Sequence, residues 1–106
     1  MFEIDFVNEK AEKEYQSLPK RIRARTASLL NRMKQSGPNL GMPHARALAN
    51  GIFEVRAKAE EGIGRTLYCT QVRKRIYILH AFVKKAQKTP RNELAIAQER
   101  MKEIPI

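Results

Sequence analysis

Three strand-like segments follow one another between residues 53 and 82, and only short turns separate them. In the first, Phe53–Lys58, apolar and polar residues alternate, which is typical of a strand with one buried face. Glu60-Glu61-Gly62 predicts a turn before the second strand, Arg65–Val72. Arg73-Lys74 predicts another turn before the third strand, Arg75–Phe82. Short turns join antiparallel neighbours, so this stretch predicts a curved, largely antiparallel sheet.

The third strand differs from the first because it is apolar at consecutive positions, from Ile76 to Leu79. A strand of this kind is covered on both faces, and we expect it in the centre of the sheet. Directly after it, His80–Pro90 contains one His and three Lys and no acid. A basic segment that bears a His at the end of a rigid strand is well suited to hold phosphates and to transfer protons.

The N-terminal part of the chain predicts one strand and two helices. Phe2, Ile4 and Phe6 alternate with acids and predict a short strand. Asn8 can cap a first helix, and Pro19 can occupy the first turn of a second one that ends at Gly37-Pro38. We expect these helices to form an antiparallel hairpin that covers one face of the sheet.

Two further segments complete the predicted domain. Residues 37–51 contain three Gly and two Pro and predict a loop, with one helical turn near Ala45–Ala49. Thr89 is expected to cap a C-terminal helix that has Pro90 at its first position. The whole chain, residues 1–106, is therefore predicted to be one α+β domain with the order β-α-α-β-β-β-α.

Charge is the strongest compositional signal. The chain carries 21 Lys and Arg against 11 Asp and Glu, a net charge of +10. Between Glu14 and Glu54 there are seven Lys or Arg and no acid, and from Gly62 to Asn92 there are eight and again no acid. Such tracts often form solvated faces, but two of them in one small domain favour a polyanionic partner.

Several classes of protein are disfavoured. Cys69 is the single cysteine, so neither an internal disulfide nor a cysteine-based metal site is possible, and we expect it in the core. Neither a Gly-rich phosphate loop nor metal-ligand spacing is present, so no metal or cofactor is predicted. His44 is expected to be an exposed loop residue. The N-terminus does not resemble a signal peptide, and the apolar runs are too short to span a membrane, which predicts a cytoplasmic protein.

Chemistry on this chain must therefore come from Lys, Arg, His and Tyr. These residues suit RNA cleavage by the RNA's own 2′-hydroxyl group, in which a base removes the hydroxyl proton, cations stabilise the phosphate and an acid protonates the leaving oxygen. Tyr68 could stack on a base. Arg and Lys on the polar face of a sheet also serve solubility, so composition alone leaves this open. The candidates for phosphate binding and proton transfer are Arg56, Arg65, His80, Lys84, Lys85 and Lys88.

Three stretches together resemble a known family. They are Leu48–Arg56, then Gly64-Arg65 with Tyr68, and then Leu79–Pro90 with Glu93. In this combination they resemble the HigB branch of the RelE/ParE toxin superfamily, including its phage-derived members. The resemblance implies a RelE-like fold and the toxin of a type II toxin–antitoxin system. Such toxins enter the ribosomal A site and cut mRNA there without a metal, and an acidic antitoxin, expected here to be of the helix-turn-helix type, neutralises them.

The resemblance also implies roles for individual residues. Arg56 and Arg65 would contact the scissile phosphate, and Lys84 or Lys85 would occupy the place of basic catalytic residues. His80 would be either a proton-transfer group or an oriented structural residue. Further RNA contacts would come from Lys58, Tyr68, Lys88 and Arg91. The sequence departs from the RelE pattern because no Tyr follows the last strand and Glu54 stands where a Lys is common, so the identity of the general base stays open.

Two other functions agree with the same fold. A gyrase poison of the ParE type needs none of the RNA-cleaving residues. A non-enzymatic module, such as a decayed toxin, would still bind its antitoxin or nucleic acid.

Overall fold

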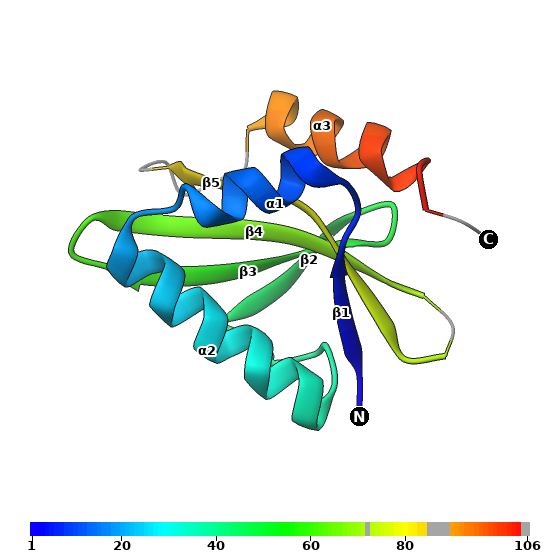
Figure 1. Ribbon diagram of the computed structural model, residues 1–106, viewed down its shortest axis with the longest axis horizontal. Coiled ribbons are helices and arrows are strands. Elements are labelled where there is room, and N and C mark those ends of the chain that lie inside the picture. Colours follow the sequence, from blue (N-terminus) through cyan, green and yellow to red (C-terminus); the bar gives the residue numbers. More distant parts are fainter. Residues whose placement is uncertain (72, 85–89, 105–106) are drawn as a thin grey trace.

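The computed structural model of the protein describes residues 1–71, 73–84 and 90–104. Over these residues the chain forms a five-stranded sheet in the order β1-β5-β4-β3-β2 (Figure 1). Strand β1 runs parallel to β5, and the other neighbours are antiparallel, so the predicted α+β fold is confirmed. The strands are β1 (Glu3–Phe6), β2 (Ala45–Ala49), β3 (Ile52–Ala59), β4 (Gly62–Gln71) and β5 (Arg75–Lys84), and the helices are α1 (Glu9–Gln16), α2 (Lys20–Ser36) and α3 (Arg91–Met101).

The two faces of the sheet carry separate apolar cores. Helices α1 and α2 cover one face, where Tyr15, Ile22 and Met33 pack on alternate residues of the strands. Helix α3 lies on the other face (Figure 1), where Ala97 and its apolar neighbours pack on β4 and β5. Gly64 permits the close approach of α2, because a Cβ at this position would overlap the side chain of Ile22.

Strand β2 corrects the prediction of a helical turn at Ala45–Ala49. These residues pair antiparallel with β3 and form an edge strand, so the element order contains one strand more than predicted. Alanine favours helices, which explains the error. In the fold, pairing with β3 and burial of Ala45 outweigh that local preference.

Strand β5 is an interior strand, as its apolar sequence indicates, although the middle place in the sheet belongs to β4. Ile76 and Ile78 join the core under α1 and α2, while Leu79 joins the core under α3. The register between β4 and β5 shifts here, because Leu67 pairs with His80 and Tyr68 pairs with Ile78. This bulge leaves Leu79 as the extra residue of β5.

The predicted starts of the three helices and the predicted end of α2 agree with the structure to within a residue. The side chain of Asn8 accepts a hydrogen bond from the Ala11 amide at 2.9 Å and caps α1, as predicted. Pro19 and Pro90 stand directly before α2 and α3 rather than inside their first turns, and Thr89 lies outside the described residues. Among the helices described, none has the length and apolarity that a membrane crossing requires.

Candidate active site

The cross-strand register brings the predicted basic residues together on one face of the sheet. Arg56 on β3 pairs with Arg65 on β4, and Arg65 pairs with Phe82 on β5. In the next row, Ile63 lies between Lys58 and Lys84. Residues that are paired in this way project from the same face of a sheet. The four predicted cations of the two rows therefore share the face on which α3 lies.

A buried carboxylate lies at the centre of this group. The Glu54 side chain is fully buried, and its oxygens lie 3.2 Å from Nε of Arg46, 3.9 Å from Nε of Arg56 and 3.6 Å from a terminal nitrogen of Arg65. We call these four residues the arginine cluster. Three guanidinium groups against one carboxylate leave the cluster with a net charge of +2.

The three arginines differ in depth. The side chains of Arg46 and Arg56 are 30% and 23% exposed, whereas that of Arg65 is fully buried. Burial lowers the pKa of Arg65, the neighbouring Arg56 and Arg46 lower it further, and Glu54 opposes both effects. Arg65 was predicted to contact the scissile phosphate, but in this conformation its guanidinium group lies beneath the surface. Arg46 and Arg56 are therefore the members of the cluster whose positive charge is partly exposed to solvent.

Tyr68 lies in the core rather than on an RNA-binding surface. Its side chain is 1% exposed, its ring stacks on Phe53 with 5.7 Å between centroids, and its hydroxyl group donates to the Pro38 carbonyl at 2.7 Å. Burial raises its pKa to about 12. The expected stacking on a base is therefore not available in this structure, because both the ring and the hydroxyl group have protein partners.

His80 belongs to a second ionic cluster. Its Nδ1 atom lies 2.7 Å from a Glu14 oxygen and its Nε2 atom 3.0 Å from a Glu93 oxygen, while Arg100 binds both oxygens of Glu14 at 2.8 Å. We call these four residues the His80 cluster. Both contacts of the ring are hydrogen bonds when both of its nitrogens carry protons. Of the two predicted roles, this arrangement favours the structural one.

The same cluster also binds the free edge of β5. The Ala81 amide donates to Glu14 at 3.3 Å, and Arg100 donates to the Leu79 carbonyl at 3.0 Å. Glu14 comes from α1, and Glu93 and Arg100 come from α3. Hydrogen bonds from Arg100 and His80 outweigh the effect of burial and lower the pKa of Glu14 below its usual 4.5. The His80 cluster thus joins two helices to one strand.

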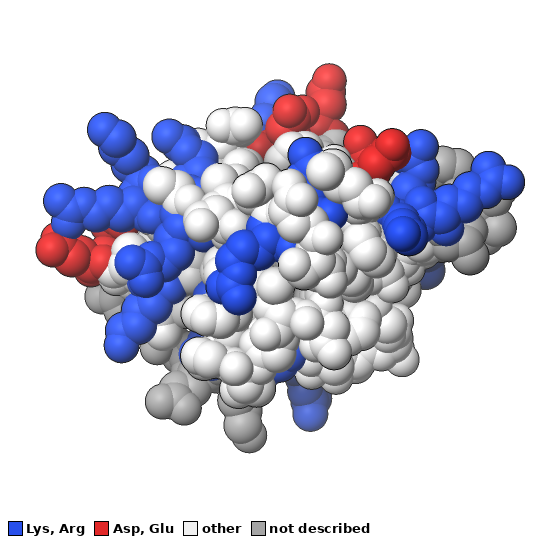
Figure 2. Space-filling view, turned by 90° about the horizontal axis from the view of Figure 1, so that it is seen from below, with Lys and Arg blue, Asp and Glu red and all other residues white. Residues whose placement is uncertain are grey.

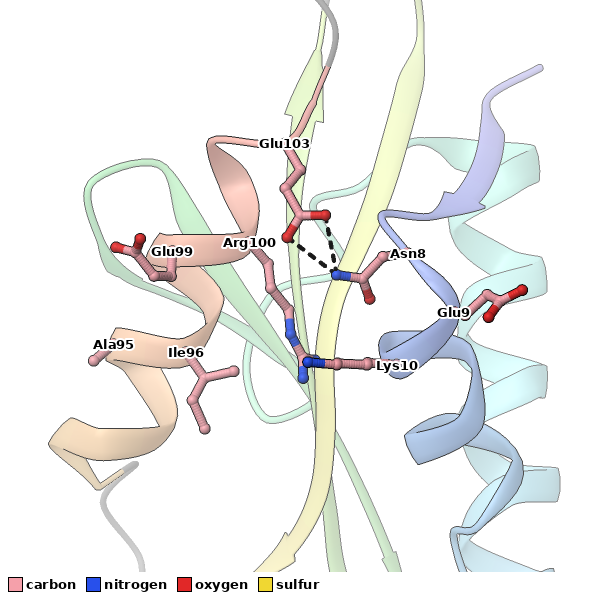
Figure 3. Close-up of a pocket in the computed structure, with 8 residues that line it drawn as sticks. All are labelled: Asn8, Glu9, Lys10, Ala95, Ile96, Glu99, Arg100 and Glu103. Carbon is pink, nitrogen blue, oxygen red and sulfur yellow. Dashed lines mark hydrogen bonds between the residues drawn. The ribbon is translucent and has the colours of Figure 1, made fainter.

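A groove between α1 and α3 borders this cluster (Figure 3). It measures about 780 Å³, and Arg100 reaches across it from α3 while Asn8 donates to Glu103 at 3.2 Å. Its lining mixes three acids with two basic residues, in contrast to the cationic rows on the sheet. None of the predicted site residues lines it, so its size does not make it the candidate site.

Four predicted basic residues lie at or after the end of β5. Arg91 is exposed at the start of α3, and Lys84 is half-buried near the end of β5. Lys85 and Lys88 lie outside the described residues. Figure 2 shows that basic side chains gather toward both ends of one face of the molecule, around a largely uncharged surface, while acidic ones are confined to its margin.

The sequence alone did not reveal four members of the two clusters. Arg46 was assigned to a loop, Glu93 entered only as part of the family resemblance, and Glu14 and Arg100 were given no role. Glu93 and Arg100 are seven residues apart, so they lie on one side of α3, and that spacing could have indicated a shared partner. Glu14 is separated from His80 by 66 positions, and no local pattern predicts their contact.

Two solved structures have the same fold as this chain. A mutant of the E. coli toxin RelE in the free state is 19% identical, with a TM-score of 0.60, and the match covers 94% of this chain and 97% of RelE. YoeB in the YoeB–YefM complex from Staphylococcus aureus is 20% identical, with a TM-score of 0.59, and the match covers 79% of this chain and 98% of YoeB. The fold is therefore that of the RelE and YoeB toxins.

Sequence comparison identifies the family directly. No curated protein matches the chain significantly. The family described as "Phage derived protein Gp49-like" matches residues 13–102, which run from α1 to the end of α3. Because this match spans most of the chain, the protein belongs to the Gp49-like family of phage-derived proteins.

Proposed function

We propose that the protein is the toxin of a type II toxin–antitoxin system, of the HigB branch of the RelE/ParE superfamily. Its activity would be ribosome-dependent cleavage of mRNA in the A site, without a metal. The observation that carries the proposal is the placement of Arg46, Arg56 and Lys58 with Lys84 on one face of the sheet, around a cluster that keeps a net positive charge. The positive net charge of the chain also suits binding to the negatively charged ribosome in the cytoplasm.

The proposed reaction uses the RNA as its own nucleophile. A base takes the proton of the 2′-hydroxyl group, the 2′-oxygen bonds to phosphorus, and the bond from phosphorus to the 5′-oxygen breaks as that oxygen gains a proton. Arg46 and Arg56 would bind the phosphate oxygens as negative charge builds up. Lys84 or Lys85 would exchange the protons. Buried Glu54 and Arg65 would hold the two outer arginines in position from below.

The proposed partners follow from the same charge. An acidic antitoxin would meet the basic surface, and electrostatic steering would make its association fast and dependent on salt. The likeness to YoeB, which was solved in complex with YefM, supports a toxin that assembles with such a protein. We propose a helix-turn-helix antitoxin, as in HigB-like systems, and ribosomal RNA as the surface on which the toxin acts.

The test is to map mRNA 5′ ends after brief expression of the wild-type protein and of Arg56→Gln and Lys84→Gln variants. We expect wild-type cuts inside translated frames and a loss of about a hundredfold in each variant, which is the effect of removing one transition-state donor. Arg32→Gln is the matched control, because Arg32 is an exposed residue of α2 outside the site.

The outcomes separate the candidate functions. Normal cutting by both variants, with their folding verified by thermal melting, would contradict the assignment of the site. A wild-type protein that produces no cuts but binds its antitoxin would be a binding module. A DNA-damage response without loss of translation would indicate a gyrase poison.

A further inference from the structure

A second hollow lies at the outer edge of β3. It measures about 490 Å³, and its lining comes from α2, the loop before β2, and the adjoining ends of β3 and β4. Among its eight lining residues, four can carry positive charge and none is acidic. The residues are Arg25, Ser28, Leu29, Pro43, His44, Arg56, Lys58 and Ile63.

The hollow exists because β2 is shorter than β3. Pairing of the two strands ends at Ala45 and Val55, and the Arg56 amide then donates to the His44 carbonyl at 2.8 Å. Beyond this point β3 continues to Ala59 without β2 beside it. Because edge contacts alternate along an antiparallel strand, the Lys58 amide is directed to the same open edge as that of Arg56. Helix α2 borders this edge and supplies Arg25.

The acids closest in sequence to this edge are engaged elsewhere. Glu60 pairs with Arg21, and Glu61 accepts from the amides of Arg21 and Ile22 at 3.3 and 3.2 Å, which caps the start of α2. Glu54 is buried in the arginine cluster, where one of its partners is Arg56. Within the described part of the chain, Arg25 and Lys58 form no ion pair with an acid, so these two cations of the hollow can attract an anion from outside.

Arg56 connects the hollow to the arginine cluster. It lines the hollow and is also one of the partly exposed arginines around Glu54. Its Nε atom is buried and makes no hydrogen bond within the part of the chain that the structure describes. That nitrogen instead faces a Glu54 oxygen at 3.9 Å, so a phosphate oxygen in the hollow would be bound by the partly exposed remainder of the Arg56 side chain.

We propose that this hollow binds a backbone phosphate of single-stranded RNA, adjacent to the phosphate held over the arginine cluster. The inference rests on the proposed function and extends it to a second subsite. Arg56 and Lys58 are two residues apart, so their positions along β3 differ by about 7 Å. A flexible chain can therefore pass from the open face of the sheet around the edge of β3 to Arg25 of α2. This continuity favours a nucleic acid over an acidic peptide.

The experiment measures binding of a short, fluorescent, fully 2′-deoxy oligonucleotide, which has no nucleophile and cannot be cleaved by the proposed reaction. We expect Arg25→Gln and Lys58→Gln each to weaken binding about tenfold, the effect of losing a hydrogen bond between charged groups. The slope of log K against log salt should become shallower by about 0.7 for each phosphate that a variant no longer neutralises. Arg32→Gln removes the same charge from α2 outside the hollow and should change both quantities much less.

Two results would overturn the inference. If Arg25→Gln and Arg32→Gln weakened oligonucleotide binding equally, the oligonucleotide would be responding to the overall positive charge of the protein and not to a site in the hollow. An oligoglutamate peptide that binds the wild-type protein and loses affinity in Arg25→Gln, while oligonucleotide affinity is unchanged, would make it a carboxylate site. Because the probe is not cut, binding that depends on Arg25 supports the subsite whether or not the protein cleaves mRNA. If such binding were found without any mRNA cuts, the result would count against the proposed function but not against the subsite.

Discussion

The two ionic clusters of this small domain both combine Arg with Glu, but they differ in their balance of charge. In the arginine cluster, one carboxylate faces three guanidinium groups. In the His80 cluster, two carboxylates face one guanidinium group and an imidazole ring. A cluster without an excess of positive charge can hold elements together without attracting an anion, whereas an excess of cations keeps a field that reaches into solvent. The imbalance, rather than burial, distinguishes the candidate site.

The clusters also differ in what they join. The His80 cluster links α1 and α3 to β5 and occupies backbone groups at the strand's edge. Three members of the arginine cluster, Arg46, Glu54 and Arg56, lie on the adjacent strands β2 and β3, which are already paired, and Arg65 lies on the next strand, β4. The arginine cluster is therefore not needed to bring separate elements together, because the strands that carry it are already paired.

Glu54→Gln tests this difference with the largest expected effect. It leaves three guanidinium groups around a neutral side chain, and we expect a loss of about 4 kcal/mol in the free energy of unfolding, since removing one charge of a buried ion pair is strongly destabilising. Added phosphate should restore part of this loss, because an anion that binds only the folded state stabilises it. Urea unfolding with and without phosphate measures both effects.

The matched control is Glu60→Gln, which removes an exposed acid from the turn between β3 and β4. It should change stability by less than about 1 kcal/mol and should show no particular response to phosphate. Should phosphate stabilise both variants equally, the arginine cluster would have no special affinity for anions, and the comparison between the clusters would fail.

Arg100→Met tests the other cluster and should have the next largest effect. Glu14 would lose a partner that binds both of its oxygens, and the Leu79 carbonyl would lose a donor. We expect a loss of about 3 kcal/mol, somewhat less than for Glu54 because these side chains are partly exposed. Phosphate should not restore it. Arg91→Met is the control because Arg91 is exposed, and its free energy of unfolding should differ from that of the wild type by less than about 0.5 kcal/mol. Recovery of Arg100→Met by phosphate would contradict a purely structural role.

These contrasts also explain how much could be predicted from the sequence. The strands β3, β4 and β5 were predicted in the right order because alternation and turn residues are local signals, although β4 begins at Gly62, inside the predicted turn and three residues before its predicted start. Their register places Arg56, Lys58 and Lys84 on one face. Strand β2 was missed because an alanine-rich segment looks helical until a neighbouring strand pairs with it.

Contacts between residues that are far apart in the sequence could not be predicted from local sequence patterns. The sequence marked Glu54 only as an unusual residue and His80 as a residue with two possible roles. Their partners come from other elements, and the depth of Arg65 depends on how the faces of the sheet are covered. Side-chain pairing across the fold, rather than secondary structure, is what separates the proposed phosphate-binding group from the structural one.

Acid titration of Glu14 should give the smallest effect and sharpen the comparison further. Its pKa is lowered in the folded protein, so ionised Glu14 stabilises the fold above about pH 4.5, and this contribution is lost as the pH falls through the folded-state pKa. Glu14→Gln keeps the shape and an acceptor for Arg100, so we expect it to be modestly less stable than the wild type at pH 7. This difference in the free energy of unfolding between the two proteins should decrease steadily toward pH 3. Urea unfolding across this range measures it, with Glu12→Gln on the exposed side of α1 as the control. A gap that does not depend on pH would mean that the charge of Glu14 is not what holds α1 and α3 to β5.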